Sequence, residues 1–211
     1  MIPNSAKVIS IALSLLVSSP FSRAVIPEKA SFTPEKGSHV EQNKGRSMLS
    51  QEEAQFIEMI ANTVQQGNQF IDYQELIKQA PTYNKGAFWY EAAVALSSLP
   101  NSNELDIREN GSLRVSLDIL DKLLKSNARF PQIWAQKIIV LNYLAHSHWS
   151  MGNALSLTTE VDQASLHITN SKRYASDLLT TTQNAVVRFP DDNWFIAERD
   201  TALEDFAEWV N

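Results

Sequence analysis

The stretch LDKLLKSNARFPQIWAQKIIVLNYLA, Leu120–Ala145, decides the fold class. Leucines at helical spacing lead into a short polar turn, Pro131 follows, and Trp134 opens a second and strongly apolar helical pattern. Proline cannot continue a helix, but it suits the first turn of the next one. The same order returns in RFPDDNW at Arg188–Trp194, 59 residues after the RFP that begins at Arg129. Two such breaks predict antiparallel helices joined by short turns.

Helical spacing of apolar residues continues through nearly the whole chain after Met48. No alternating run of apolar and polar residues is long enough to predict a strand. The chain is therefore expected to be all-α, with helices over residues 51–67, 68 or 72 to 80, 85–99, 113–127, 132–149, about 160 to 187, and from 191 or 192 to the C-terminus. The helix over 132–149 is the most apolar, so we expect it to be covered on more than one face.

The expected helix ends carry specific signals. Ser50 and Glu53 match a capping box, and Gly67 suits the left-handed residue that ends a helix. Further N-caps are expected at Asp72 (with Glu75), at Ser112, and at Asp191 or Asp192, and stops at Pro81, Pro100 and Gly152.

Two helices have distinctive compositions. The one over 160–187 is rich in Thr, Ser and Asn, which are indifferent helix formers, so an interruption near Thr169–Ser171 is expected. The last helix should bury one stripe, made of Phe195, Ala202, Leu203, Phe206 and Val210.

The two RFP junctions resemble those between successive tetratricopeptide repeats, in which a helix leads through a proline-containing turn to a helix opened by Trp. This resemblance implies a right-handed stack of helical hairpins that binds other proteins. The family's repeat of 34 residues does not fit the 59-residue interval, because two units would span 68. An irregular helical bundle is the alternative architecture.

The N-terminus reads as an export signal. Lys7 precedes the apolar run Val8–Val17, and small residues follow up to Ala24, so residues 1–24 are expected to be a signal peptide cleaved after Ala24. A membrane anchor is the alternative, but ten apolar residues would cover only about 15 Å as a helix. Residues 25–47 are polar and aperiodic, which predicts a flexible tether before a single helical domain over 48–211.

Composition narrows the class of function. The chain has no cysteine, which excludes disulfides and a lipid-anchored lipoprotein and favours a bacterial periplasmic or secreted protein. Cleavage would remove Lys7 and Arg23 from 18 basic residues and none of the 24 acidic ones, giving a net charge of −8. We expect neither nucleic acid nor an anionic membrane surface as a partner, and a basic protein as a favoured one.

Catalytic chemistry has little support in the sequence. His146 and His148 lie about 200° apart around a helix, so they cannot share a metal ion there. No nucleophile elbow or phosphate-binding glycine loop is present, and we expect no metal ion and no cofactor. Glu91 is the one carboxylate suited to an enzyme, because three aromatic residues precede it.

The favoured hypothesis is an exported adaptor or scaffold that binds another envelope or secretion-machinery protein. A small acidic inhibitor or immunity-type protein acting on a basic toxin or hydrolase is the alternative, and an envelope enzyme is the third. The last helix contains five acidic residues and one basic residue, Arg199. This acidic side suits either a surface that docks a partner or a solvent-exposed helix that caps the end of the array. The candidate partner-binding residues are Trp89, Tyr90, Tyr143, Trp149, Glu198, Glu204, Asp205 and Glu208.

Overall fold

The structure is a computed structural model that describes residues 49–67, 70–83, 85–100 and 105–210, without the side chains of Ala207 and Val210. Every regular element in these residues is a helix, which confirms the all-α class. The helices are α3 (Gln51–Gln65), α4 (Tyr73–Ile77), α5 (Gly86–Leu96), α6 (Ser112–Asn127), α7 (Pro131–Ser156), α8 (Val161–Arg188) and α9 (Asn193–Val210). The expected signal peptide and tether lie outside the described residues.

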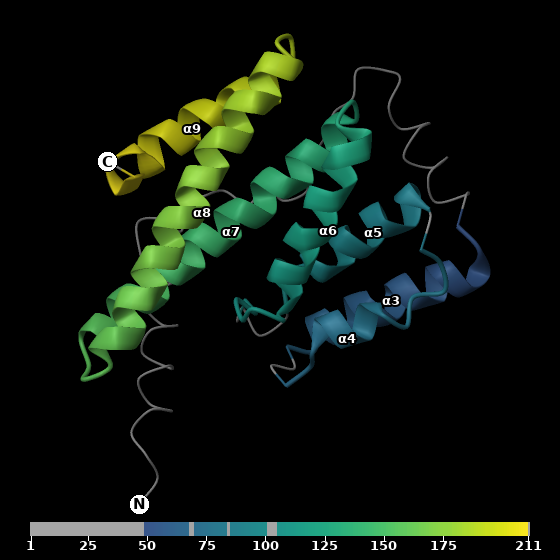
Figure 1. Cartoon of the computed structure of the whole chain (residues 1–211), viewed down its shortest axis with the longest axis horizontal. Coiled ribbons are helices and arrows are strands. Elements are labelled where there is room, and N and C mark those ends of the chain that lie inside the picture. Colours follow the sequence, from purple (N-terminus) through teal and green to yellow (C-terminus); the bar gives the residue numbers. More distant parts are fainter. Residues whose placement is uncertain (1–48, 68–69, 84, 101–104, 211) are drawn as a thin grey trace, which may run out of the picture.

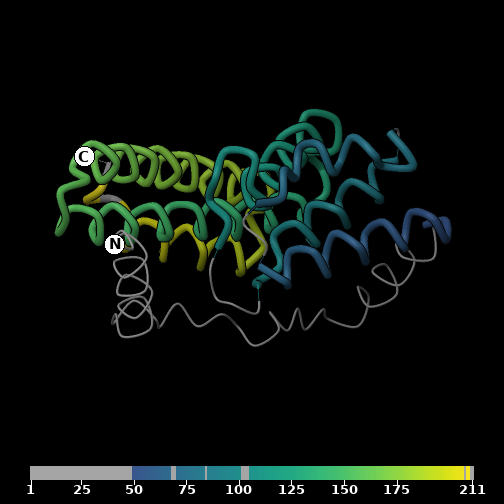
Figure 2. The backbone as a smooth tube through the Cα atoms, turned by 90° about the horizontal axis from the view of Figure 1, so that it is seen from below, coloured from purple at the N-terminus to yellow at the C-terminus, as the bar shows by residue number. Residues whose placement is uncertain are grey.

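The long helices pack in chain order. α5 lies against α3, α6 against α5, α7 against α6, α8 against α7 and α9 against α8, with the most extensive contact between α7 and α8 (Figure 1). Figure 2 shows the same order along the molecule, from α3 at the blue end to α8 and α9 at the yellow-green end. One hydrophobic core runs through this array, and α7 is covered on more than one face, as its apolar pattern predicted.

The predicted capping box starts α3. The Ser50 hydroxyl accepts a hydrogen bond from the Glu53 backbone N–H at 3.2 Å, and the Glu53 carboxylate accepts one from the Ser50 N–H at 2.7 Å. The same carboxylate accepts from Lys85 Nζ at 2.7 Å, which ties the start of α3 to the start of α5. Gly67 has φ of 65° and follows the helix end, as predicted.

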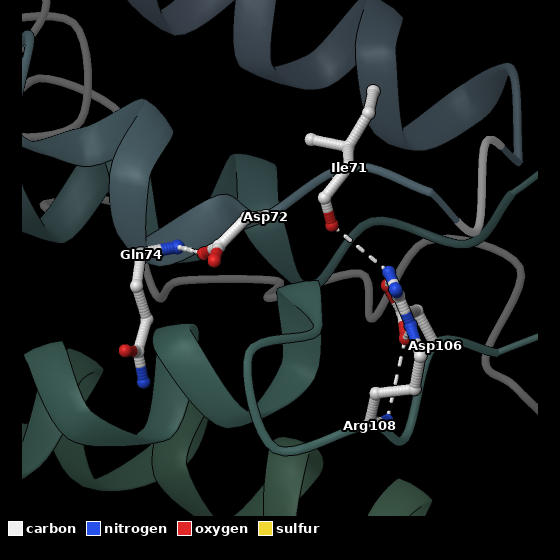
Figure 3. A network of polar contacts seen from close by, with 5 residues as sticks. All are labelled: Ile71, Asp72, Gln74, Asp106 and Arg108. Atoms are coloured by element: carbon white, nitrogen blue, oxygen red, sulfur yellow. Dashed lines mark hydrogen bonds and ion pairs between the residues drawn. The ribbon is translucent and has the colours of Figure 1, made fainter.

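The connection before α6 is held against α4. Asp72 caps α4 through the N–H groups of Gln74 and Glu75, whereas the helix ends at Ile77, earlier than the expected Ala80. Figure 3 shows Arg108 bridging the Asp106 carboxylate and the Ile71 carbonyl, with Arg108 Nη2 2.9 Å from the carbonyl oxygen. The hydrogen bonds with Asp106 raise the pKa of Arg108, so this clamp stays charged.

The predicted cap at Ser112 is wrong. Gly111 occupies the N-cap position of α6, no side chain caps it, and Ser112 is the buried first residue of the helix. A Cβ atom at Gly111 would lie 2.4 Å from Asp106 Oδ1, so the fold of the preceding loop leaves no room for a side chain there. The packing of Asp106, which local sequence does not reveal, therefore decides where α6 begins.

Small residues bring α7 and α8 together. Gly152 lies inside α7 and does not end it, which corrects the expected stop. A Cβ at Gly152 would lie 2.6 Å from Ile168 Cδ1 and 3.1 Å from the Ile168 backbone nitrogen. About one turn of α8 beyond Ile168, the buried Ser171 donates a hydrogen bond from its hydroxyl to the Ala145 carbonyl oxygen at 2.8 Å. We call this contact, formed by Ala145, Gly152, Ile168 and Ser171, the α7–α8 seam.

No interruption occurs near Thr169–Ser171, because α8 is continuous from Val161 to Arg188. Two of its buried polar side chains, Ser171 and Thr182, have partners that leave the helix intact. Ser171 bonds to α7, and Thr182 donates to the Leu178 carbonyl oxygen of its own helix at 3.0 Å. The predicted break was wrong because intrinsic propensity is a weak guide where tertiary packing covers a helix.

The two RFP junctions are both helix-to-helix turns, but they differ in detail. Pro131 is the first residue of α7, and Trp134 Nε1 donates to the Ala128 carbonyl oxygen at 2.8 Å. Pro190 lies in a turn instead, and Asp192 caps α9 by accepting from the Trp194 N–H at 3.0 Å. The interval between the junctions is one long hairpin, α7 and α8, rather than two short repeats.

The last helix buries a narrower stripe than predicted. Phe195, Ala202 and Phe206 are buried, whereas Leu203 is 48% exposed. The side chain of Val210, the fifth predicted member, lies outside those that the structure describes. Leu203 is one residue beyond Ala202, so it lies about 100° around the helix from that buried residue. Because α9 is the last helix of the array, no further helix in the described chain covers that side.

The α7–α8 seam predicts a specific sensitivity. In the Gly152→Ala variant, overpacking should cost about 1–3 kcal/mol. Alanine gains roughly 1 kcal/mol over glycine inside a helix, so the free energy of unfolding should fall by up to about 2 kcal/mol. Urea unfolding followed by circular dichroism measures the change.

Gly86→Ala is the matched control, because a Cβ at Gly86 meets only Asn127 Nδ2, at 4.0 Å. It should leave stability unchanged or raise it. Equal stability of the Gly152→Ala and Gly86→Ala variants would contradict the close approach at the seam.

Candidate functional site

Two predicted partner-binding residues lie together on α5. Trp89 is partly buried, packs edge-on against the buried Phe88, and donates its Nε1–H to the Tyr83 carbonyl oxygen at 3.1 Å. Tyr90 is more enclosed: burial, with a smaller effect from the charge of Glu91, raises its pKa to about 12. Both side chains are only partly exposed and therefore serve mainly in packing.

The other two aromatic candidates lie on α7. Tyr143 is partly buried, and burial raises its pKa. Trp149 stacks on Trp209 of α9, with ring centroids 4.3 Å apart. His146, one helical turn before Trp149, packs against Phe206 and Trp209 at 4.7 and 5.8 Å. These four rings, His146, Trp149, Phe206 and Trp209, join the C-terminal half of α7 to the end of α9.

The acidic residues of α9 divide between two environments. Glu198 is half-buried, and burial raises its pKa, so it does not belong to the solvent face that was expected to carry it. Asp205 is also half-buried, and its charge acts on His146. Asp200, Glu204 and Glu208 are exposed and share one side of the helix with Leu203. We call Asp200, Leu203, Glu204 and Glu208 the α9 face.

The structure brings some candidates together and separates others. Trp149 lies where α7 and α9 touch, and Asp205 of α9 acts on the nearby His146, whereas Trp89 and Tyr90 lie on α5, on the other side of α7 (Figure 1). The eight residues therefore do not form one surface. The group that includes the α9 face is the stronger candidate, since it combines an exposed apolar side chain with exposed charge.

A second cluster, which the sequence did not reveal, surrounds Tyr174 of α8. Tyr174 is 2% exposed, and its hydroxyl accepts from Arg114 Nη1 at 2.6 Å and from Arg173 Nη2 at 2.9 Å. The ring of His148 stacks on Tyr174 at 5.5 Å, and His148 Nδ1 lies 2.9 Å from Nδ1 of His167. His167, Arg173 and Tyr174 all lie on α8, but no local pattern in the sequence shows that Arg114 of α6 and His148 of α7 meet them.

The histidine pair is held in its neutral form. A 2.9 Å contact between two Nδ1 atoms requires one ring to donate and the other to accept. Burial, together with the nearby charges of His167, Arg173 and Arg114, lowers the pKa of His148 to about 4. Burial also lowers the pKa of His167.

Other kinds of site find no support in the described part of the chain. No group of three or more His, Asp or Glu side chains there is arranged to hold a metal ion. Glu91 is half-buried on α5 and lies next to Tyr90. Within residues 49–67, 70–83, 85–100 and 105–210, none of the helices has both the length and the hydropathy to cross a membrane.

Comparisons with known proteins give no match: no protein-family model fits the chain, and neither the curated proteins nor the solved structures include one with significant similarity. The function must therefore be inferred from the chain's own residues.

The histidine pair predicts a titration well below the usual range. His148 should titrate with a pKa of about 4, whereas an unperturbed histidine titrates near 6.5. Between these values the unfolded chain binds more protons than the folded one, so folding stability falls as the pH is lowered from 6.5 towards 4. The Cε1–H resonance of His148, followed by NMR against pH, measures the pKa directly.

The variant His148→Gln removes this titration, so its folding stability should fall less steeply between pH 6.5 and pH 4. His146 and His167 should still titrate in the variant. A His148 midpoint near 6.5 would show that the ring is solvated and would contradict the buried pair.

Proposed function

We propose that the protein is an exported adaptor that binds another protein of the cell envelope through the α9 face. The observation that carries this proposal is Leu203, which is 48% exposed among the exposed acidic residues Asp200, Glu204 and Glu208. Protein–protein interfaces combine apolar side chains with a polar, solvent-accessible rim, and Leu203 supplies an apolar side chain beside these polar ones. The position of α9 at one end of the array leaves this side accessible.

The charge of the surface supports a basic partner. The range of α9 contains five acidic residues and Arg199, and the Arg199 guanidinium pairs with Asp200 at 2.6 Å. The whole chain has a formal charge of −6, and cleavage of the proposed signal peptide would make it more negative. Complementary charge speeds association and excludes wrong partners, even where it adds little affinity.

A tetratricopeptide-like array of hairpins is the architecture that we propose for this role. Packing in chain order and the proline-containing turns at Pro131 and Pro190 support it. The array would be irregular, because the hairpin of α7 and α8 spans residues 131–188, far more than a 34-residue repeat. An irregular helical bundle remains the alternative.

The same acidic face also supports a second function, an inhibitor or immunity-type protein that neutralises a basic toxin or hydrolase. This alternative differs from an adaptor in the nature of the partner, not in the surface used. An envelope enzyme acting through Glu91, which is half-buried on α5 beside Tyr90, is the third candidate.

Crosslinking in living cells tests the proposal. A photo-reactive amino acid in place of Asp200 should give one dominant crosslinked protein, identified by mass spectrometry. The double variant Glu204→Lys and Glu208→Lys should abolish that product, because it reverses two charges at the rim of the interface. A resident envelope protein as the product supports the adaptor, and a single basic toxin or hydrolase whose activity is blocked supports the inhibitor.

Glu58→Lys is the matched control, since Glu58 is an exposed acid on α3 at the other end of the array. It should leave the crosslink intact. The assignment of the partner to the α9 face would be contradicted by either of two results. The crosslinked product could persist in the Glu204→Lys and Glu208→Lys double variant, or Glu58→Lys could remove it equally.

A further inference from the structure

Two arginine side chains converge on one buried oxygen. Arg114 of α6 and Arg173 of α8 both donate to the hydroxyl of Tyr174, at 2.6 and 2.9 Å. Because both bonds share that oxygen, the two donor nitrogens can be no farther apart than the sum of these distances. The guanidinium carbons also lie over the Tyr174 ring, at 5.5 and 4.7 Å from its centroid, which fixes the position of each group.

Neither guanidinium has a counterion among the described residues. The ion pairs found there involve Glu53, Glu75, Asp106, Asp121 and Asp200, and none includes Arg114 or Arg173. Asp118 and Asp177 lie four residues after these arginines, at a spacing that often forms a helical ion pair, yet neither lies within 4.0 Å of them. Two like charges so close together are unfavourable unless an anion joins them.

The remaining donors suit an oxyanion. A guanidinium has five N–H donors, and the Tyr174 oxygen takes one from each arginine, so most of them remain available. Planar forks of this kind bind phosphate and carboxylate groups with two parallel hydrogen bonds. Arg173 is exposed and Arg114 is half-buried, so a ligand can reach both from solvent.

A cation is the wrong ligand for this cluster. The histidine pair beneath Tyr174 has nitrogen atoms suited to a metal ion, but its two Nδ1 atoms already contact each other. The two arginines also place positive charge beside the pair, which repels a metal ion. The net charge of the cluster therefore selects an anion, and two positive groups match a dianion better than a monoanion.

We propose that Arg114 and Arg173, positioned by Tyr174, form a binding site for a dianionic phosphate group. This site is made by α6 and α8 and does not include the α9 face, so it does not depend on the proposed partner surface. The His148 ring stacks on Tyr174 and should report on binding, because a bound dianion would offset the arginine charges that act on His148.

The test is an NMR titration of the full chain with inorganic phosphate at low, constant ionic strength. The ring resonances of His148 and His167 should shift and saturate. His146 is the internal control, because it lies on the same helix but packs against Phe206 and Trp209 of α9. Glycerol phosphate tests whether the group is bound as a monoester, and acetate tests the preference for a dianion.

Variants assign the binding to the arginines. Arg114→Gln and Arg173→Gln should each weaken phosphate binding by about tenfold or more, since each removes a charge-assisted hydrogen bond. Lys172→Gln, which removes the exposed charge next to Arg173, should leave binding within about twofold, because surface charges contribute little. Circular dichroism checks that each variant is folded.

Binding of glycerol phosphate as well as phosphate would identify a phosphate monoester as the natural ligand, and binding of phosphate alone would identify the free ion. Either result supports the site. Three results would overturn it: no saturable shift of His148 in the unmodified chain, acetate binding as tightly as phosphate, or equal losses from Lys172→Gln and Arg173→Gln.

Discussion

The close approach of α7 and α8 is the constraint on which the rest of the structure depends. Gly152 leaves no space for a Cβ against Ile168, and Ser171 hydrogen-bonds across the same seam to the Ala145 carbonyl. These two helices are the longest in the described chain and share its most extensive contact. α6 packs on α7 and α9 packs on α8, so each side of the molecule rests on this hairpin.

The α9 face and the Arg114–Arg173 site both depend on the packing of α7 against α8. The pairing of α7 with α8 sets His148 against His167 and stacks its ring on Tyr174, which positions the two arginines. The packing of α9 on the outside of the same hairpin covers one stripe of that helix and leaves Leu203 and its acidic neighbours exposed. The proposed partner surface and the proposed phosphate site therefore both depend on the α7–α8 hairpin but have no residue in common.

Local chemistry predicted the helix ends that depend only on neighbouring residues. The capping box at Ser50, the left-handed Gly67 and the cap at Asp72 were read from the sequence because each acts within one helical turn. Gly152 and Gly111 could not be interpreted in this way. Their roles depend on Ile168 and Asp106, which reach them through the folded chain.

The candidate sites were predictable to different degrees. The acidic character of the last helix was visible in composition, whereas the half-burial of Glu198 and the exposure of Leu203 depend on how α9 sits on α8. The arginine pair was not predictable, because Arg114 and Tyr174 are 60 residues apart and meet only when α6 and α8 flank α7. A single sequence contains no local pattern that predicts a contact between two residues so far apart in the chain.

Native-state hydrogen exchange, followed residue by residue, tests the central role of the α7–α8 hairpin most directly. The account predicts that the slowest amides are those of α7 and α8 along the seam, around Ala145 and Ser171, and that α3 and α4 open at lower free energy because they contact only the first helices of the array. Slowest exchange in α3 and α5, with α7 and α8 opening first, would contradict it.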